Sequence, residues 1–250
     1  MHPLDRVFWA LARLFPAAPA DGLDGPRGEG RIGPEWVARQ PGGRRLPDGG
    51  LVPDPGVLGH GSLAAPIAAF YARTAALHLR MTCRWNPVFR PPARVFEALY
   101  PARWGQLEIP PSDAVQLTNE VWTWGDGERV WVRRYAGTDR AFFVIQYDVV
   151  ELAGVRYIRL TFPVPGGAWA VLLRLVRDGE RLILTEAGGA PGGAGLYLLP
   201  TGGIPRYVRA LREEITLSSV GGEMHAVHTF DWWGIRFLTL TYVGASTGSA

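Results

Sequence analysis

The sequence predicts a mainly β protein: an antiparallel, barrel-like sheet of about ten strands, lipocalin-like or similar, with two or three N-terminal helices packed on it. Two observations carry this prediction. From about residue 115 onward, apolar segments of strand length are separated by short turns, and such short connections join antiparallel neighbours. No segment of helical period is inserted between these strands, which argues against a parallel sheet. A long antiparallel meander removes its exposed edges by closing into a barrel.

The N-terminal part of the chain places apolar residues at helical spacing. Within residues 1–15, one face of an amphipathic helix collects Leu4, Val7, Phe8, Leu11, Leu14 and Phe15. A second helix is expected over about 63–77 and a third over about 93–104, with an extended segment between them that ends in prolines. The first helix either docks on its own domain or touches a membrane or a partner, and the sequence leaves both alternatives open.

Between the first two helices, residues 16–60 are rich in proline, glycine and aspartate. This composition disfavours regular elements, so we expect an extended arm. The single β-rich domain is then predicted to cover residues 61–245, and residues 246–250 are predicted to form a disordered tail.

The strands are read from apolar segments bounded by turn residues such as "GDG" and "DGE". We expect them at residues 115–124, 129–135, 142–150, 155–162, 169–177, 182–186, 196–199, 209–218, 223–232 and 235–243. Several are apolar on both faces, which a sheet needs when helices cover its outer side. The inner face would then line a core or a cavity.

Composition and charge exclude several classes of function. All 26 basic residues are arginine, so neither a Schiff-base lysine nor a P-loop lysine is available. The arginines are scattered among acidic residues, so no nucleic-acid partner is expected. The single cysteine, Cys83, rules out an internal disulfide framework and suits a cytoplasmic location. Membrane association stays open through residues 1–15, although no segment approaches the roughly 18 apolar residues of a membrane span.

Motifs that would name a reaction are missing from the sequence. It contains no nucleophile elbow, no HExxH and no Walker motif. The GxGxxG match at residues 28–33 has no strand before it, and Pro34 follows it at once, so it does not predict dinucleotide binding. We therefore expect no cofactor and no metal, and we assign no catalytic residue.

Strand alternation singles out one acid and one histidine. Side chains in a strand point to alternate faces, so Glu213 shares the apolar face of "LREEITL" with leucine and isoleucine neighbours. His228 shares the apolar face of "EMHAVHTFDW", whereas His225 points to the opposite, polar face. The two strands are neighbours, so Glu213 and His228 can meet. Buried ionisable groups must be paired, neutral or at a cavity, which predicts either pocket residues or a structural pair.

The order of several motifs is similar to that of an uncharacterised bacterial domain. The motifs are "IAAFYARTAALHLRMTCRWNPVFRP", "WGQLEIP", "VWVRRYAG", "GLYLLP", "REEITL" and "HTFDWWGIRFLTLTY". They resemble the C-terminal domain of YndJ-type membrane proteins and the related domain fused to saccharopine-dehydrogenase-like reductases. The resemblance covers about residues 64–243 and implies no established activity.

The resemblance also points to individual residues. It places the family's aromatic–arginine pair on Trp131 and Arg133, its glycine–aromatic pair on Gly195 and Tyr197, and its strand acid and histidine on Glu213 and His228. An arginine such as Arg133 can neutralise an acid or hold an anionic group.

The leading hypothesis is therefore a barrel that binds a small, largely apolar molecule such as a lipid or an isoprenoid. Its ligand-binding residues would be Glu213, His228, Arg133, Tyr197 and Trp131. Two alternatives remain. One is an enzyme that uses His228 and Glu213 as an acid–base pair. The other is a module that contacts a protein or a membrane.

Overall fold

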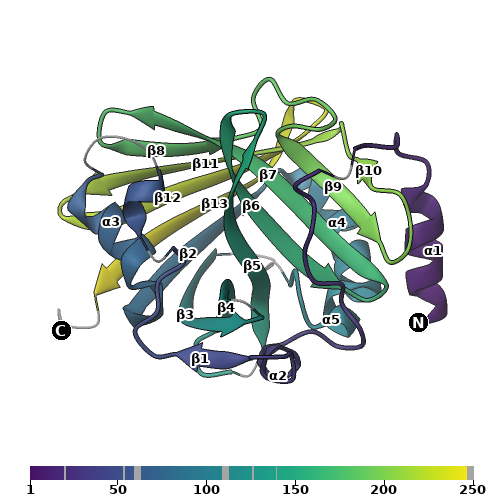
Figure 1. Cartoon of the computed structure of the whole chain (residues 1–250), viewed down its shortest axis with the longest axis horizontal. Coiled ribbons are helices and arrows are strands. Elements are labelled where there is room, and N and C mark those ends of the chain that lie inside the picture. Colours follow the sequence, from purple (N-terminus) through teal and green to yellow (C-terminus); the bar gives the residue numbers. More distant parts are fainter. Residues whose placement is uncertain are drawn as a thin grey trace.

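The computed structural model describes residues 1–19, 21–52, 54–58, 63–108, 113–125, 127–138 and 140–246. It shows a closed antiparallel β-barrel with short helices at its ends (Figure 1). The barrel strands are β2 (Leu77–Trp85), β3 (Asp113–Trp124), β4 (Glu128–Tyr135), β5 (Ala141–Leu152), β6 (Val155–Val164), β7 (Gly167–Asp178), β8 (Arg181–Thr185), β11 (Leu211–Val220), β12 (Glu223–Trp232) and β13 (Ile235–Ser246). The predicted fold class is confirmed. Most of the predicted tail, residues 247–250, lies outside the described residues.

The barrel follows the order β7-β6-β5-β4-β3-β2-β13-β12-β11-β8, and β8 returns to β7. Most neighbours are consecutive in the chain, as short hairpin connections require. Two neighbouring pairs are exceptions. β8 pairs with β11, and β2, which lies between β3 and β13, closes the sheet. We predicted this segment as extended but did not include it among the strands. Its alternating burial, with Leu79, Met81 and Cys83 buried, is typical of a barrel strand.

Three further strands extend the barrel. The first half of β7 pairs with β9 (Gly195–Pro200), and its second half pairs with β8. β10 (Arg206–Tyr207) adds to the outer edge of β9, and β1 (Arg44–Leu46) pairs with β3. β9 therefore lies beside the closed ring rather than within it.

Helices cover both ends of the barrel. In Figure 1, α3 (Ala65–Ala72) lies at the left, while α1 (Pro3–Ala12), α4 (Arg90–Leu99) and α5 (Pro101–Trp104) lie at the right. The remaining helices are α2 (Pro34–Ala38), η1 (Pro55–Leu58), η2 (Thr74–Ala76) and η3 (Pro87–Phe89). The predicted helix over 63–77 is shorter because Arg73 leaves helical geometry. Tyr100 also leaves it, which splits the predicted 93–104 helix into α4 and α5.

The segment between α1 and α3 runs over the outside of the barrel. Gly28 exchanges backbone hydrogen bonds with Gly166 and Gly167 at 3.0 and 2.8 Å. A Cβ on Gly28 would lie 2.6 Å from the backbone of Val164, so glycine is required for this close approach. Further along, Trp36 and Val37 of α2 are buried in a separate outer cluster. This segment therefore packs on the domain despite its proline and glycine content.

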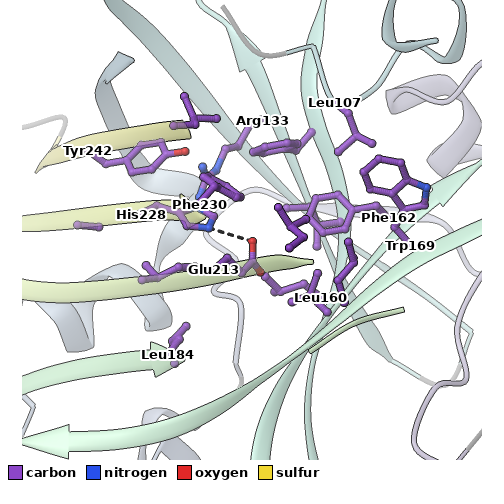
Figure 2. A pocket seen from close by; sticks show the side chains of 18 of the residues that line it. Leu107, Arg133, Leu160, Phe162, Trp169, Leu184, Glu213, His228, Phe230 and Tyr242 are labelled. Atoms are coloured by element: carbon purple, nitrogen blue, oxygen red, sulfur yellow. Dashed lines mark hydrogen bonds and ion pairs between the residues drawn. The ribbon is translucent and has the colours of Figure 1, made fainter. Parts of the chain in front are cut away.

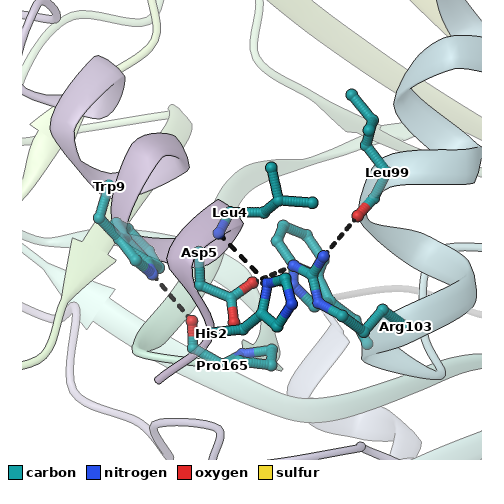
Figure 3. A network of polar contacts seen from close by, with 8 residues as sticks. His2, Leu4, Asp5, Trp9, Leu99, Arg103 and Pro165 are labelled. Atoms are coloured by element: carbon teal, nitrogen blue, oxygen red, sulfur yellow. Dashed lines mark hydrogen bonds and ion pairs between the residues drawn. The ribbon is translucent and has the colours of Figure 1, made fainter.

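Helix α1 is held on the barrel by polar contacts to buried groups (Figure 3). The carboxylate of Asp5 accepts hydrogen bonds from Arg103 and, at 2.9 Å, from the indole N–H of Trp104. The indole of Trp9 donates to the carbonyl of Pro165 at 2.8 Å. Asp5 is 2% exposed, so Arg103 and Trp104 supply the opposite charge and the hydrogen bonds that a buried carboxylate requires. Val7 and Leu11 of this helix are exposed, and so is Leu14 just after its end.

Candidate functional site

A cavity of about 600 Å³ occupies the interior of the barrel. Figure 2 shows its mixed character, with Leu160, Phe162, Leu184 and Trp169 facing the same space as a few polar groups. Helices α3 and α4 contribute aromatic residues such as Phe70 and Phe96 to its lining. A cavity of this volume, largely apolar with isolated polar groups, is typical of a site for a small molecule.

Strands β11 and β12 supply one wall with the alternation that the sequence predicts. From β11, the cavity receives Leu211, Glu213, Ile215 and Leu217; from β12, it receives Met224, Ala226, His228, Phe230 and Trp232. The register pairs Ile215 with His228 and Glu213 with Phe230, so the acid and the imidazole are diagonal neighbours. The uninterrupted period of two explains why these inward residues could be read from the sequence.

Glu213 and His228 are in contact, as their predicted faces allow. His228 Nε2 lies 3.1 Å from Glu213 Oε2, and the imidazole packs on the ring of Phe230 at 4.0 Å between centroids (Figure 2). The second carboxylate oxygen of Glu213 is buried and meets no hydrogen-bond partner among the described residues. One oxygen is therefore left to receive a donor, while the other fixes the imidazole.

A second acid, Glu186, faces the same cavity. Burial, and then the nearby charge of Glu213, raise the pKa of Glu186 to about 9, so this carboxyl is protonated at neutral pH. Its Oε1 also meets no partner in the described part of the chain. We did not predict this residue, but a signal was present: Glu186 follows Leu182 and Leu184 at spacing two and so shares their inward face.

Arg133 enters the cavity from β4 and is surrounded by aromatic rings. Its guanidinium carbon lies 3.6 Å from the ring centroid of Trp131 and 4.8 Å from that of Tyr242. Burial lowers the pKa of Arg133, and the hydroxyl of Tyr242 opposes this effect. Trp131 is itself fixed by a 3.0 Å hydrogen bond from its indole to Asn119. Cation–π contacts of this kind stabilise a desolvated guanidinium.

Tyr197 is placed elsewhere. It lies on β9 with its side chain in a separate cluster on the outer side of the sheet, and its hydroxyl donates to the carbonyl of Gly193 at 2.7 Å. Its neighbour Leu196 faces the cavity instead. Four of the five predicted ligand-binding residues therefore line the cavity: Glu213, His228, Arg133 and Trp131. Tyr197 lies outside it.

The cavity thus has two polar regions in an apolar lining. One holds a carboxylate–imidazole pair beside a protonated carboxyl, an arrangement that can accept and donate a proton. The other holds a guanidinium among aromatic rings. No group of three or more histidine, cysteine, aspartate or glutamate residues is arranged to hold a metal in the part of the chain that the structure describes.

Comparison with known proteins finds one distant similarity. The chain is 27% identical over 230 residues to the uncharacterised membrane protein YndJ of Bacillus subtilis (strain 168). It is thus a distant relative of YndJ. The match covers 86% of this chain but only 41% of YndJ, so the chain corresponds to less than half of that protein. The resemblance to the reductase-fused domain stays a prediction.

Other comparisons add no further relative. No family model and no solved structure matches the chain. None of the helices within the described residues combines the length and apolar character that crossing a bilayer requires.

Proposed function

We propose that the barrel binds a small, largely apolar molecule, such as a lipid or an isoprenoid. The observation that carries this proposal is the cavity of about 600 Å³, whose lining is apolar except for a few buried polar side chains. Apolar side chains that face a cavity of this size make few dispersion contacts while only water occupies it. An apolar ligand would restore those contacts, and the polar groups would fix its orientation.

Native mass spectrometry with lipid extraction of the purified protein tests this proposal. We expect a bound molecule in the wild-type protein and its loss from Ala226→Trp, because Ala226 faces the cavity and an indole would occupy its volume. The matched control is Val227→Trp on the same strand, which points outward and should keep the ligand. A wild-type protein that carries no ligand, and that binds none from a panel of lipids, would contradict the proposal.

Acid–base catalysis is the second candidate function, and Glu186 is the observation that favours it. A carboxyl held protonated beside the Glu213–His228 pair supplies the third group that such an enzyme requires. Incubating the extracted compound with fresh protein separates the two candidates. A compound recovered unchanged after incubation with fresh protein supports binding alone, whereas conversion that disappears in Glu213→Gln supports catalysis.

We also propose that the protein is cytoplasmic and contacts a membrane surface through residues 1–15. The exposed stripe of Val7, Leu11 and Leu14 supports this contact, as does the description of YndJ as a membrane protein. We expect the wild-type protein to float with vesicles of anionic phospholipid. The variant that combines Val7→Ser, Leu11→Ser and Leu14→Ser should stay in the fraction without vesicles. A control with Val176→Ser and Val220→Ser, both exposed elsewhere, should still float. Equal flotation of all three proteins would contradict this contact.

A further inference from the structure

We propose that the cavity ligand carries an anionic head group, a carboxylate or a phosphate, and that Arg133 binds it. This inference rests on the proposed function and adds the chemical class of the ligand. Arg133 lies on β4, lines the cavity and is only 9% exposed. Its guanidinium is therefore a positive charge inside an apolar chamber rather than on the surface.

Among the described residues, Arg133 has no counter-ion, unlike three other arginines of low exposure. Within the described residues, no carboxylate lies within 4.0 Å of its guanidinium, and its Nε is buried without a hydrogen-bond partner. The contrast is with three arginines of low exposure that each meet an acid: Arg103 with Asp5, Arg134 with Glu120 and Arg159 with Asp148.

An arginine side chain does not lose its proton in proteins, so burial cannot be relieved by neutralisation. The rings of Trp131, Tyr242 and Phe143 offset part of the desolvation, but they accept no N–H hydrogen bond of full strength. A carboxylate or phosphate would supply both the missing charge and two oxygens that match the guanidinium fork.

Hydroxyl groups next to Arg133 complete a site for an anion. Figure 2 shows the Tyr242 hydroxyl directed toward the guanidinium, and this hydroxyl makes no hydrogen bond of good geometry in the described part of the chain. Tyr71 and Tyr147 lie close by, with their hydroxyls 3.2 Å apart. Burial raises the pKa of Tyr71 to about 12, so its hydroxyl stays protonated at neutral pH.

The acidic side of the cavity sets the orientation of such a ligand. An anionic head group beside the Glu213 carboxylate would be repelled, whereas beside Arg133 it would be attracted. The apolar tail is then directed along the aliphatic and aromatic walls, toward residues such as Leu160 and Phe162. The asymmetry of charge, and not the shape of the cavity alone, selects an amphiphile with a negative end.

Calorimetric titration with matched single-chain amphiphiles tests this inference. The probes are dodecanoate, dodecyl phosphate, dodecanol and dodecylamine, which share a tail and differ in the head group. We expect the wild-type protein to bind at least one of the two anions at least about tenfold more tightly than dodecanol, as charge-assisted hydrogen bonds require. The ratio between dodecanoate and dodecyl phosphate identifies which anion the site prefers.

Variants assign the preference to Arg133. Arg133→Met should bind dodecanol as well as the wild-type protein does but should lose the preference for anions. Tyr242→Phe should weaken anion binding about threefold to tenfold. Arg80→Met, on the outer face of β2, should behave as wild type.

The outcomes separate the two proposals. If dodecanol binds wild-type protein as tightly as both anions do, or if Arg133→Met keeps the preference for anions, the head-group assignment is wrong and the apolar ligand stands. If no probe binds, the proposed function fails as well.

Discussion

Replacing Arg103 with methionine should lower the free energy of unfolding by about 3–5 kcal/mol, because it leaves a buried carboxylate without its counter-ion. The side chain of Asp5 is 3% exposed, and Arg103 is the cation that it meets (Figure 3). The remaining hydrogen bond from Trp104 cannot balance the charge. Urea unfolding followed by tryptophan fluorescence would measure the loss.

Two further variants test whether the loss of stability comes from the unpaired carboxylate of Asp5. Arg94→Met removes an exposed arginine from the neighbouring helix α4 and should unfold close to the wild-type midpoint. Combining Arg103→Met with Asp5→Asn removes the unpaired charge and should restore part of the lost stability. If Arg103→Met unfolds at the same urea concentration as Arg94→Met, the contact does not hold α1 on the barrel.

The second large effect is on the pH dependence of stability. The pKa of Glu186 is raised from 4.5 to about 9, first by burial and then by the charge of Glu213. Between these two pH values the folded protein keeps a proton that the unfolded chain releases, so stability falls as pH rises through this range. The slope contributed by this group is up to about 1.4 kcal/mol per pH unit.

Glu186→Gln should remove this contribution, because an amide is neutral in both states. We expect the variant to be more stable than wild type by about 3 kcal/mol at pH 7 and to show no advantage near pH 4. Glu151→Gln, at an exposed position, should leave the profile unchanged. Melting curves recorded from pH 4 to 9 would provide the difference profile, and parallel curves for wild type and Glu186→Gln would show that the carboxyl is ionised when folded.

The cavity wall was predictable wherever strands alternate without interruption. In β11 and β12, a period of two placed Glu213 and His228 on one inner face, and their contact follows from that pairing. Glu186 is the last residue of the predicted strand 182–186 and lies just beyond β8. Its inward position was readable from Leu182 and Leu184, but the raised pKa depends on burial that only the closed barrel creates.

Which face of β9 looks into the cavity was not predictable, and Tyr197 entered the predicted site through the resemblance alone. Within the described residues, β9 pairs with the first half of β7 and with β10, beside the ring. Alternation says which residues share a face, but it does not say which face looks into the cavity. The sequence also did not reveal that β2 closes the barrel, because its partners in β13 are distant in the chain.

That distant pairing governs when the chain can complete its fold during synthesis. Trp85 of β2 pairs with Leu238 of β13, which is 153 positions later (238 minus 85). Most of the polypeptide must therefore leave the ribosome before the ring can form. Until then, the apolar residues that will line the cavity lie on an open sheet with two unpaired edges. Such a sheet is prone to self-association. Pairing between such distant segments is associated with slow folding, which prolongs this exposed state.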